Sequence, residues 1–163
     1  MALFFTGEFV YALDSQRRVA VPKEWREKES EGVFYIMPDR GHRLQMFTPA
    51  YLSDMYAKLS KMSFANSAEM SALGQLGSKI KECRYDKQGR IAIPEWLLEH
   101  AQIKRGASVD TEIILVGAIA MVHIWSKENW AKQCLPPDVV LDSIDNVIKG
   151  SAGSSDPLAR KGS

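Results

Sequence analysis

Short apolar and β-branched runs recur along the chain, each followed by a turn signal. Residues 8–13 (EFVYAL) predict a strand, and residues 18–21 (RVAV) predict a short second strand that pairs with it as a hairpin. Pro22 ends this strand, and KEWREKES predicts a helix as far as Gly32. VFYIM and RLQMF predict two more strands around the turn PDRGH. The segment therefore reads β, β, short α, β, β.

The second half of the chain repeats this plan. The predicted elements are strands at 80–85, 90–93, 110–117 and 120–125, with a short helix near 94–101. Between the halves, residues 49–62 have apolar positions at helical spacing, which predicts a helix with one face in the core. After the second half, a short helix is expected from Lys127, and PPDVVLDSIDNVIKG predicts a docked terminal helix.

One sequence motif of twelve residues occurs twice in this pattern. DSQRRVAVPKEW runs from Asp14 to Trp25, and DKQGRIAIPEWL runs from Asp86 to Leu97. A long period that occurs only twice indicates a duplicated half-domain, not a solenoid. Each half is small for an independent core, so we expect the two to share one. The predicted divisions are a first repeat with its trailing helix at 4–62, a connecting helix at 63–78, a second repeat at 79–135, a terminal helix at 136–149 and a disordered tail at 150–163.

Composition narrows the class of protein. With 45% apolar residues, and with 21 lysines and arginines against 20 acidic residues, the chain resembles an ordinary soluble globular protein. Cys83 and Cys134 have no metal-type spacing, so free thiols are expected. The N-terminus lacks the basic region of a signal peptide, and the longest apolar run is too short to span a bilayer. These features predict a cytoplasmic protein with no membrane partner.

Each predicted hairpin turn begins with an aspartate that is followed four residues later by an arginine, Asp14 with Arg18 and Asp86 with Arg90. The carboxylate can accept backbone N–H groups, and the arginine can reach back to it across the turn. One interpretation is a structural salt bridge on a solvated charged face. The other is a pair of basic hairpins of the size that enters the DNA major groove, where arginine binds guanine or phosphate.

The two turns differ at one position. Gly89 suits a backbone with positive φ, whereas the first turn has Arg17 there. We expect Arg17 to carry backbone strain unless its turn differs in shape.

No catalytic or metal-binding set competes with these turns. His42, His100 and His123 lie on a predicted loop, helix end and strand, without a nucleophile nearby, so each is interpreted as structural or surface. There is no phosphate-binding glycine loop and no metal spacing, so no enzyme activity, cofactor, metal or small-molecule substrate is predicted. The four tryptophans, Trp25, Trp96, Trp125 and Trp130, are expected to anchor the core and not to stack on bases.

These motifs together resemble the MraZ family, the two-repeat relatives of AbrB-type swapped-hairpin regulators. The resemblance covers about residues 4–133 and is carried by FTGEF, LDSQRRVAVPKEWR, YDKQGRIAIP, IILVG and IWSKENW. It implies an α+β fold in which both halves interleave their hairpins into one pseudo-two-fold barrel flanked by helices. It also implies ring-shaped homo-oligomers that bind double-stranded DNA.

The resemblance further implies a function. Members of the family regulate transcription, typically of the division and cell-wall gene cluster, at short direct repeats in its promoter, which places them on the nucleoid. Carried over by position, the DNA-binding residues are Asp14, Arg18, Asp86 and Arg90, with Arg17 and Lys87 as neighbouring additions. The first turn departs from the family pattern, because DSQRR replaces the usual glycine-containing version. An alternative from another class is an antitoxin-like protein-interaction module that uses the C-terminal tail.

Overall fold

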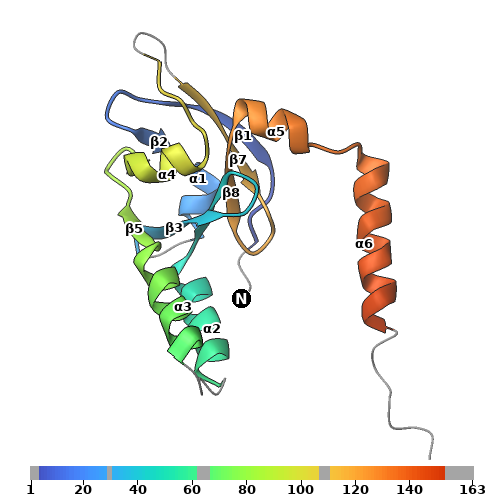
Figure 1. The fold of residues 1–163 in the computed structure, drawn as a ribbon. Helices are drawn as coiled ribbons and strands as arrows, with labels where there is room; N and C mark the ends of the chain where they lie inside the picture. The colour runs from blue at the N-terminus through green and yellow to red at the C-terminus, as the bar shows by residue number, and fades with distance from the viewer. Residues whose placement is uncertain (1–3, 29–30, 62–66, 107–110, 153–163) are drawn as a thin grey trace, which may run out of the picture. The chain divides into compact units, whose positions relative to one another are not determined.

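The computed structural model describes residues 4–28, 31–61, 67–106 and 111–152. The chain divides into two compact units, Met1–Trp130 and Ala131–Ser163. Within the first unit both halves follow the predicted order β, β, α, β, β, so the protein is of the mixed α+β class (Figure 1). The first half comprises β1 (Glu8–Leu13), β2 (Arg18–Ala20), α1 (Lys23–Arg26), β3 (Val33–Asp39) and β4 (Arg43–Phe47). The second half comprises β5 (Lys81–Arg84), β6 (Arg90–Ala92), α4 (Glu95–His100), β7 (Thr111–Gly117) and β8 (Val122–Ser126).

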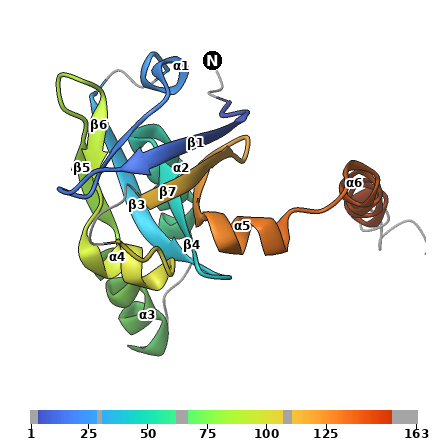
Figure 2. The ribbon, with the colours of Figure 1, turned by 90° about the horizontal axis from the view of Figure 1, so that it is seen from above.

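The strands pair between the halves of the chain. β1 pairs with β7, as both views show (Figure 1, Figure 2), while β3 pairs with β5 and β2 pairs with β6, all antiparallel. The predicted hairpin ladders of β1 with β2 and of β5 with β6 are therefore wrong, although backbone hydrogen bonds close both turns. The predicted pairs β3 with β4 and β7 with β8 are confirmed. Each half needs the other to satisfy the backbone groups of its strands.

The order of the six-stranded sheet preserves the duplication. It runs β1, β7, β8, β4, β3, β5, and exchanging every strand for its copy reads the same order backwards. β2 and β6 form a separate two-stranded ribbon. Across the strands that the structure describes, the larger sheet is open at β1 and β5, and no closed barrel is detected.

The hydrophobic core is built jointly by both halves, as the duplication predicts. Val19 and Ile91 from the two copies of the motif are both buried, and so are Val21 and Ile93. All four belong to one hydrophobic cluster. Because the small β-branched residues of each copy point into this shared core, removing either half would expose the apolar face of the other.

The tryptophans divide between the core and the surface. Trp25 and Trp125 are buried, which confirms the prediction for these two residues. Trp130 is partly buried and packs against Trp125 with ring centroids 5.9 Å apart. For Trp96 the prediction is wrong, because the residue is 40% exposed and lies beneath the ammonium group of Lys79.

The helices between the two halves contribute no buried residue, and the helix predicted after Pro22 is shorter than expected. α1 is a single turn that ends at Arg26, because Trp25 is its only buried residue and nothing apolar continues the helix towards Gly32. α2 (Pro49–Ser60) is capped by the Thr48 hydroxyl, but none of its residues is buried and Tyr56 is exposed, so the predicted core-facing stripe is only partly covered. Of the connecting helix expected at 63–78, residues 67–78 form α3 (Ser67–Ser78), and residues 63–66 lie outside the described part of the chain.

The second unit contains a long amphipathic helix. α5 (Lys127–Gln133) crosses the boundary between the units, and α6 (Pro137–Ala152) follows it. No residue of α6 is buried, and the docking expected for this helix stays a prediction. The helix continues through residues 150–152, which were expected to be part of the tail, and residues 153–163 lie outside the described part of the chain. None of the described helices is long and apolar enough to cross a bilayer.

Candidate functional site

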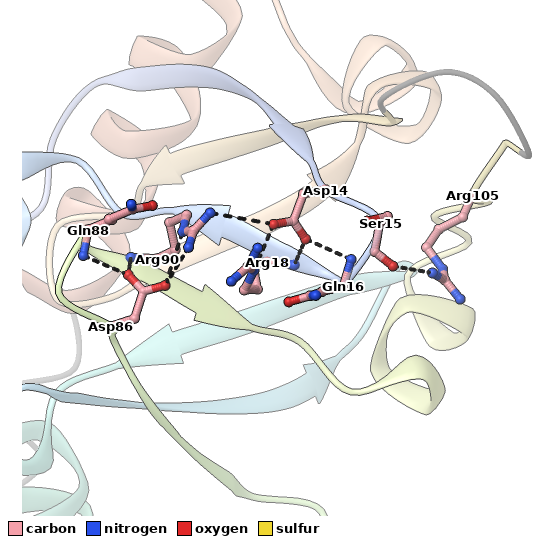
Figure 3. Close-up of polar contacts among 8 residues, drawn as sticks. All are labelled: Asp14, Ser15, Gln16, Arg18, Asp86, Gln88, Arg90 and Arg105. Atoms are coloured by element: carbon pink, nitrogen blue, oxygen red, sulfur yellow. Dashed lines mark hydrogen bonds and ion pairs between the residues drawn. The ribbon is translucent and has the colours of Figure 1, made fainter.

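The first turn is organised by the carboxylate of Asp14 (Figure 3). One oxygen, Oδ1, accepts the backbone N–H groups of Gln16 at 2.9 Å and of Arg18 at 2.8 Å. The other oxygen, Oδ2, accepts Nε–H of Arg18 at 2.7 Å. The aspartate therefore fixes both the backbone of the turn and the direction of the arginine side chain.

The second turn repeats this arrangement with Asp86 (Figure 3). Its Oδ1 accepts the backbone N–H groups of Gln88 at 2.9 Å and of Arg90 at 3.0 Å, and its Oδ2 accepts Nε–H of Arg90 at 3.0 Å. Arg90 Nη2 lies 3.0 Å from the same oxygen. The salt bridge predicted within each turn is present in both copies.

The pairing of β2 with β6 brings the two turns together. Because side chains alternate along a strand, the burial of Val19 and Ile91 places Arg18 and Arg90 on the opposite, outward face of the ribbon. Their side chains are 31% and 28% exposed, so neither is sealed in the interior. The turns also touch, because Arg90 Nη1 lies 3.7 Å from Asp14 Oδ2 (Figure 3). Sequence reasoning did not anticipate this link between residues from different halves.

Further charged side chains surround the first turn. Arg17 and Arg105 both approach Oε2 of Glu95, at 3.8 and 2.7 Å. Arg105 also donates from Nη1 to the backbone carbonyl of Ser15 at 3.4 Å (Figure 3). Sequence reasoning missed Arg105, because it lies outside the repeated motif and reaches Ser15 across 90 positions of the chain.

Beside the second turn, Lys87 is exposed and Arg26 is held by its Nε–H hydrogen bond to the Val21 carbonyl at 3.0 Å. Its guanidinium covers Gly89, where a Cβ atom would lie only 2.3 Å from Arg26 Cζ. The charged side chains described here at the two turns are six basic ones, Arg17, Arg18, Arg26, Lys87, Arg90 and Arg105, and three acidic ones, Asp14, Asp86 and Glu95. This excess of positive charge on an outward surface suits a polyanion.

The expected strain at Arg17 is present. Its φ is 60°, close to the 76° of Gly89, and both residues donate their backbone N–H to the aspartate that opens their turn, at 3.0 and 2.9 Å. The two turns therefore have the same shape, and Arg17 adopts a left-handed conformation that glycine adopts without penalty. Its Nε is also buried without a partner among the described residues.

Replacing Arg17 with glycine is expected to stabilise the fold. Relief of the left-handed strain, offset in part by the greater entropy of unfolded glycine, should raise the free energy of unfolding by about 1 kcal/mol. Urea unfolding of Arg17→Gly measures this change. Gln16→Gly is the matched control, since Gln16 has an ordinary φ and glycine there should destabilise. A destabilised Arg17→Gly variant would show that the contacts of Arg17 outweigh its strain.

The two turn carboxylates are held in their charged form. The backbone hydrogen bond from Arg90 leads the contacts that lower the pKa of Asp86 below its ordinary value, although partial desolvation opposes them. For Asp14, desolvation would raise the pKa, but the hydrogen bonds from Arg18 and Gln16 outweigh it and the net pKa is lowered. Deprotonation of both groups is thus linked to folding.

This linkage predicts an acid-dependent loss of stability. Since the folded-state pKa lies below the unfolded value of about 3.9, the contribution is complete above that pH and disappears as the pH falls through the folded-state pKa. Asp86→Asn should therefore be less stable than the parent near neutral pH, and the difference should shrink in acid. Urea unfolding midpoints of parent and variant, measured near neutral pH and at a pH below the folded-state pKa of Asp86, check this. A difference in stability between parent and variant that does not change with pH would contradict it.

Two of the histidines that the sequence singled out link elements of the fold. His100 Nε2 lies 2.7 Å from the Asp39 carbonyl oxygen, and His42 Nδ1 lies 3.3 Å from the carbonyl oxygen of His100, so these rings tie the β3–β4 turn to α4. Burial raises the pKa of the Cys83 thiol to about 11. No cluster of potential metal ligands occurs among the residues that the structure describes.

The chain is similar in sequence to proteins of one known family. A family model described as "MraZ protein, putative antitoxin-like" matches residues 78–135. Over 130 residues the chain is 30% identical to a protein from Carboxydothermus hydrogenoformans named "Transcriptional regulator MraZ", covering 80% of this chain and 86% of that protein. Over 145 residues it is 32% identical to a protein of the same name from Desulforamulus reducens, covering 88% of this chain and 97% of that protein.

Proposed function

Because the chain belongs to the MraZ family, as its similarity to these regulators over most of its length shows, we propose that it is a DNA-binding transcriptional regulator. The observation that carries the proposal is the outward pair of Arg18 and Arg90, held side by side on one two-stranded ribbon. Such a ribbon fits the major groove, and arginine pairs with guanine O6 and N7 or with phosphate. Asp14 and Asp86 orient the arginines, while Arg17 and Lys87 add phosphate contacts.

The assembly that we propose follows the family. The exchange of strands between the halves supports a swapped-hairpin barrel with a pseudo-two-fold axis. Copies of this chain form a ring that presents several pairs of turns to short direct repeats, so that weak individual contacts add up to tight binding. The proposed target is the promoter of the division and cell-wall gene cluster, which places the protein on cytoplasmic nucleoid DNA. We assign it no catalytic activity, in keeping with relatives that are named as regulators.

A second candidate function is that of an antitoxin-like interaction module. Exposed apolar residues on α6, including Leu141, Val147 and Ile148, offer a surface that a protein partner could cover. If this second function holds, the C-terminal region binds a protein partner, whether or not DNA is bound at the turns. Deleting residues 137–163 separates the two candidates, since DNA binding by the turns should survive the deletion while partner capture should not.

Selection from a pool of randomised duplexes tests the proposed function directly. The full-length protein should enrich one sequence, and its affinity for that sequence should fall steeply with salt. If about six phosphates are neutralised, raising the salt from about 50 to 200 mM should weaken binding by about 10³-fold. A scrambled duplex of equal length is the control. The proposal fails if no sequence is enriched, or if binding does not respond to salt.

A further inference from the structure

The two turns have the same backbone but different arginine contacts. Arg90 has all three guanidinium nitrogens engaged, with Nε and Nη2 each 3.0 Å from Asp86 Oδ2 and Nη1 3.7 Å from Asp14 Oδ2. Among the described residues the guanidinium of Arg18 pairs with Asp14 alone, through Nε at 2.7 Å from Oδ2. The pseudo-symmetric counterpart of the Arg90–Asp14 contact, between Arg18 and Asp86, is absent among these residues.

Exposure does not explain this difference, because the two side chains are almost equally accessible, at 31% and 28%. The difference lies in how the available hydrogen-bond donors are used. Arg90 contacts the carboxylates of both Asp86 and Asp14 and thereby joins the two turns. Asp14 holds Arg18 through Nε, and no second carboxylate among the described residues pairs with the guanidinium of Arg18.

We propose that the two arginines have unequal roles in recognition: Arg18 is the specificity-determining residue that reads guanine, and Arg90 is a positioning residue that holds the two turns in register. This inference rests on the proposed function of DNA binding and assigns its base contact to the first turn. Since no second carboxylate binds Arg18, its Nη1 and Nη2 groups can donate two hydrogen bonds to O6 and N7 of one guanine. Because Asp14 already orients Arg18, little side-chain entropy is lost when this contact forms.

The residues beside each turn agree with this division. The guanidinium of Arg26 lies over Gly89, against the backbone of the second turn. The residue that corresponds to Arg26 in the second half is Leu98, which is fully buried, so α4 places no arginine over the first turn at that position. Beside the first turn, Glu95 of α4 approaches Arg17, and Arg105 donates to the Ser15 carbonyl. Arg17 stands next to Arg18 instead, with 42% of its side chain exposed, and can bind an adjacent phosphate.

Lysine substitutions separate the two roles, since lysine keeps the charge of arginine but lacks its planar pair of donors. The assay compares the Kd for the duplex enriched by the parent protein with the Kd for a scrambled duplex. Arg18→Lys should lower this discrimination by about 10- to 100-fold and leave the salt dependence unchanged. Arg90→Lys should weaken binding to both duplexes by similar factors, so that discrimination stays within about 3-fold of the parent.

The possible outcomes distinguish this inference from the function on which it rests. If the parent protein does not discriminate between duplexes, the proposed function itself is wrong. If the parent discriminates but Arg90→Lys loses as much discrimination as Arg18→Lys, only the unequal roles are overturned. Should Arg90→Lys melt below the assay temperature, Asp86→Asn provides the same test, because it loosens Arg90 without touching Arg18 or Asp14. That variant should select the same sequence as the parent.

Discussion

Reversing the charge of Arg18 to glutamate is expected to remove DNA binding almost completely. The new carboxylate would lie beside Asp14 and face the phosphates of the duplex, so that a donor is lost and a repulsion is added. We expect a loss of about 2–4 kcal/mol in binding free energy, or about 30- to 1,000-fold in Kd. Fluorescence anisotropy with the enriched duplex measures the change.

The fold should survive this substitution. The pair of Arg18 with Asp14 is about one-third exposed, and ion pairs of this kind contribute about 0–1 kcal/mol to stability. Lys58→Glu on the exposed side of α2 is the matched control, since it makes the same change in net charge away from the turns. Equal losses of binding in both variants would mean that net charge, and not the position of Arg18, governs the affinity.

Local sequence patterns were sufficient to identify the strands but not their partners. The turn signals at Asp14 and Asp86 correctly predict that the chain reverses there, and the same aspartates close both turns. They carry no information on the neighbour that each strand finds beyond the turn. That choice depends on which pairing buries Val19 and Ile91 together, and these residues are 72 positions apart in the chain. A prediction of local hairpins therefore found the turns and assigned the wrong ladders.

The candidate site was predictable to the same extent. The repeated motif identifies the aspartate and the arginine of each turn, and the glycine of the second turn correctly points to strain at Arg17. The contact of Arg90 with Asp14 and the approach of Arg105 to Ser15 could not be predicted. Both join segments that lie far apart in the chain. The difference between Arg18 and Arg90 is likewise a property of tertiary contacts.

Aligning the two copies residue by residue would have corrected the interpretation of Trp96. At the offset of the repeat, Trp96 corresponds to Glu24, which is exposed, and Trp25 corresponds to Leu97, which is buried. Both positions keep the same environment in the two halves. The residue type alone favours burial, whereas its position in the duplicated motif shows which tryptophan faces the solvent.

Truncating Trp25 to alanine is accordingly expected to have the largest effect on stability of the substitutions considered. Its ring is fully buried, makes edge-on contacts with Phe5 and Phe9 at centroid distances of 5.8 and 5.0 Å, and donates Nε1–H to the Thr6 carbonyl. The cavity and the lost contacts should lower the free energy of unfolding by about 3–5 kcal/mol. Domains typically have a free energy of unfolding of about 5–15 kcal/mol, so the substitution would remove a large part of it.

Trp96→Ala supplies the control for this prediction, because it removes the same side chain from the corresponding helix of the second half. Trp96 is 40% exposed, and its contact with Lys79 at 5.7 Å is a cation–π interaction at the surface, worth about 0.5–1 kcal/mol. Thermal and urea unfolding of both variants should therefore give a small loss for Trp96→Ala and a several-fold larger loss for Trp25→Ala. Similar losses would contradict the prediction, because they would mean that burial of Trp25 contributes no more to stability than the exposed Trp96 does. The aromatic partners of Trp25 come from the N-terminal segment and from β1, and β1 pairs with β7 of the second half. Removing the Trp25 side chain should therefore destabilise both halves, and they should unfold in a single transition.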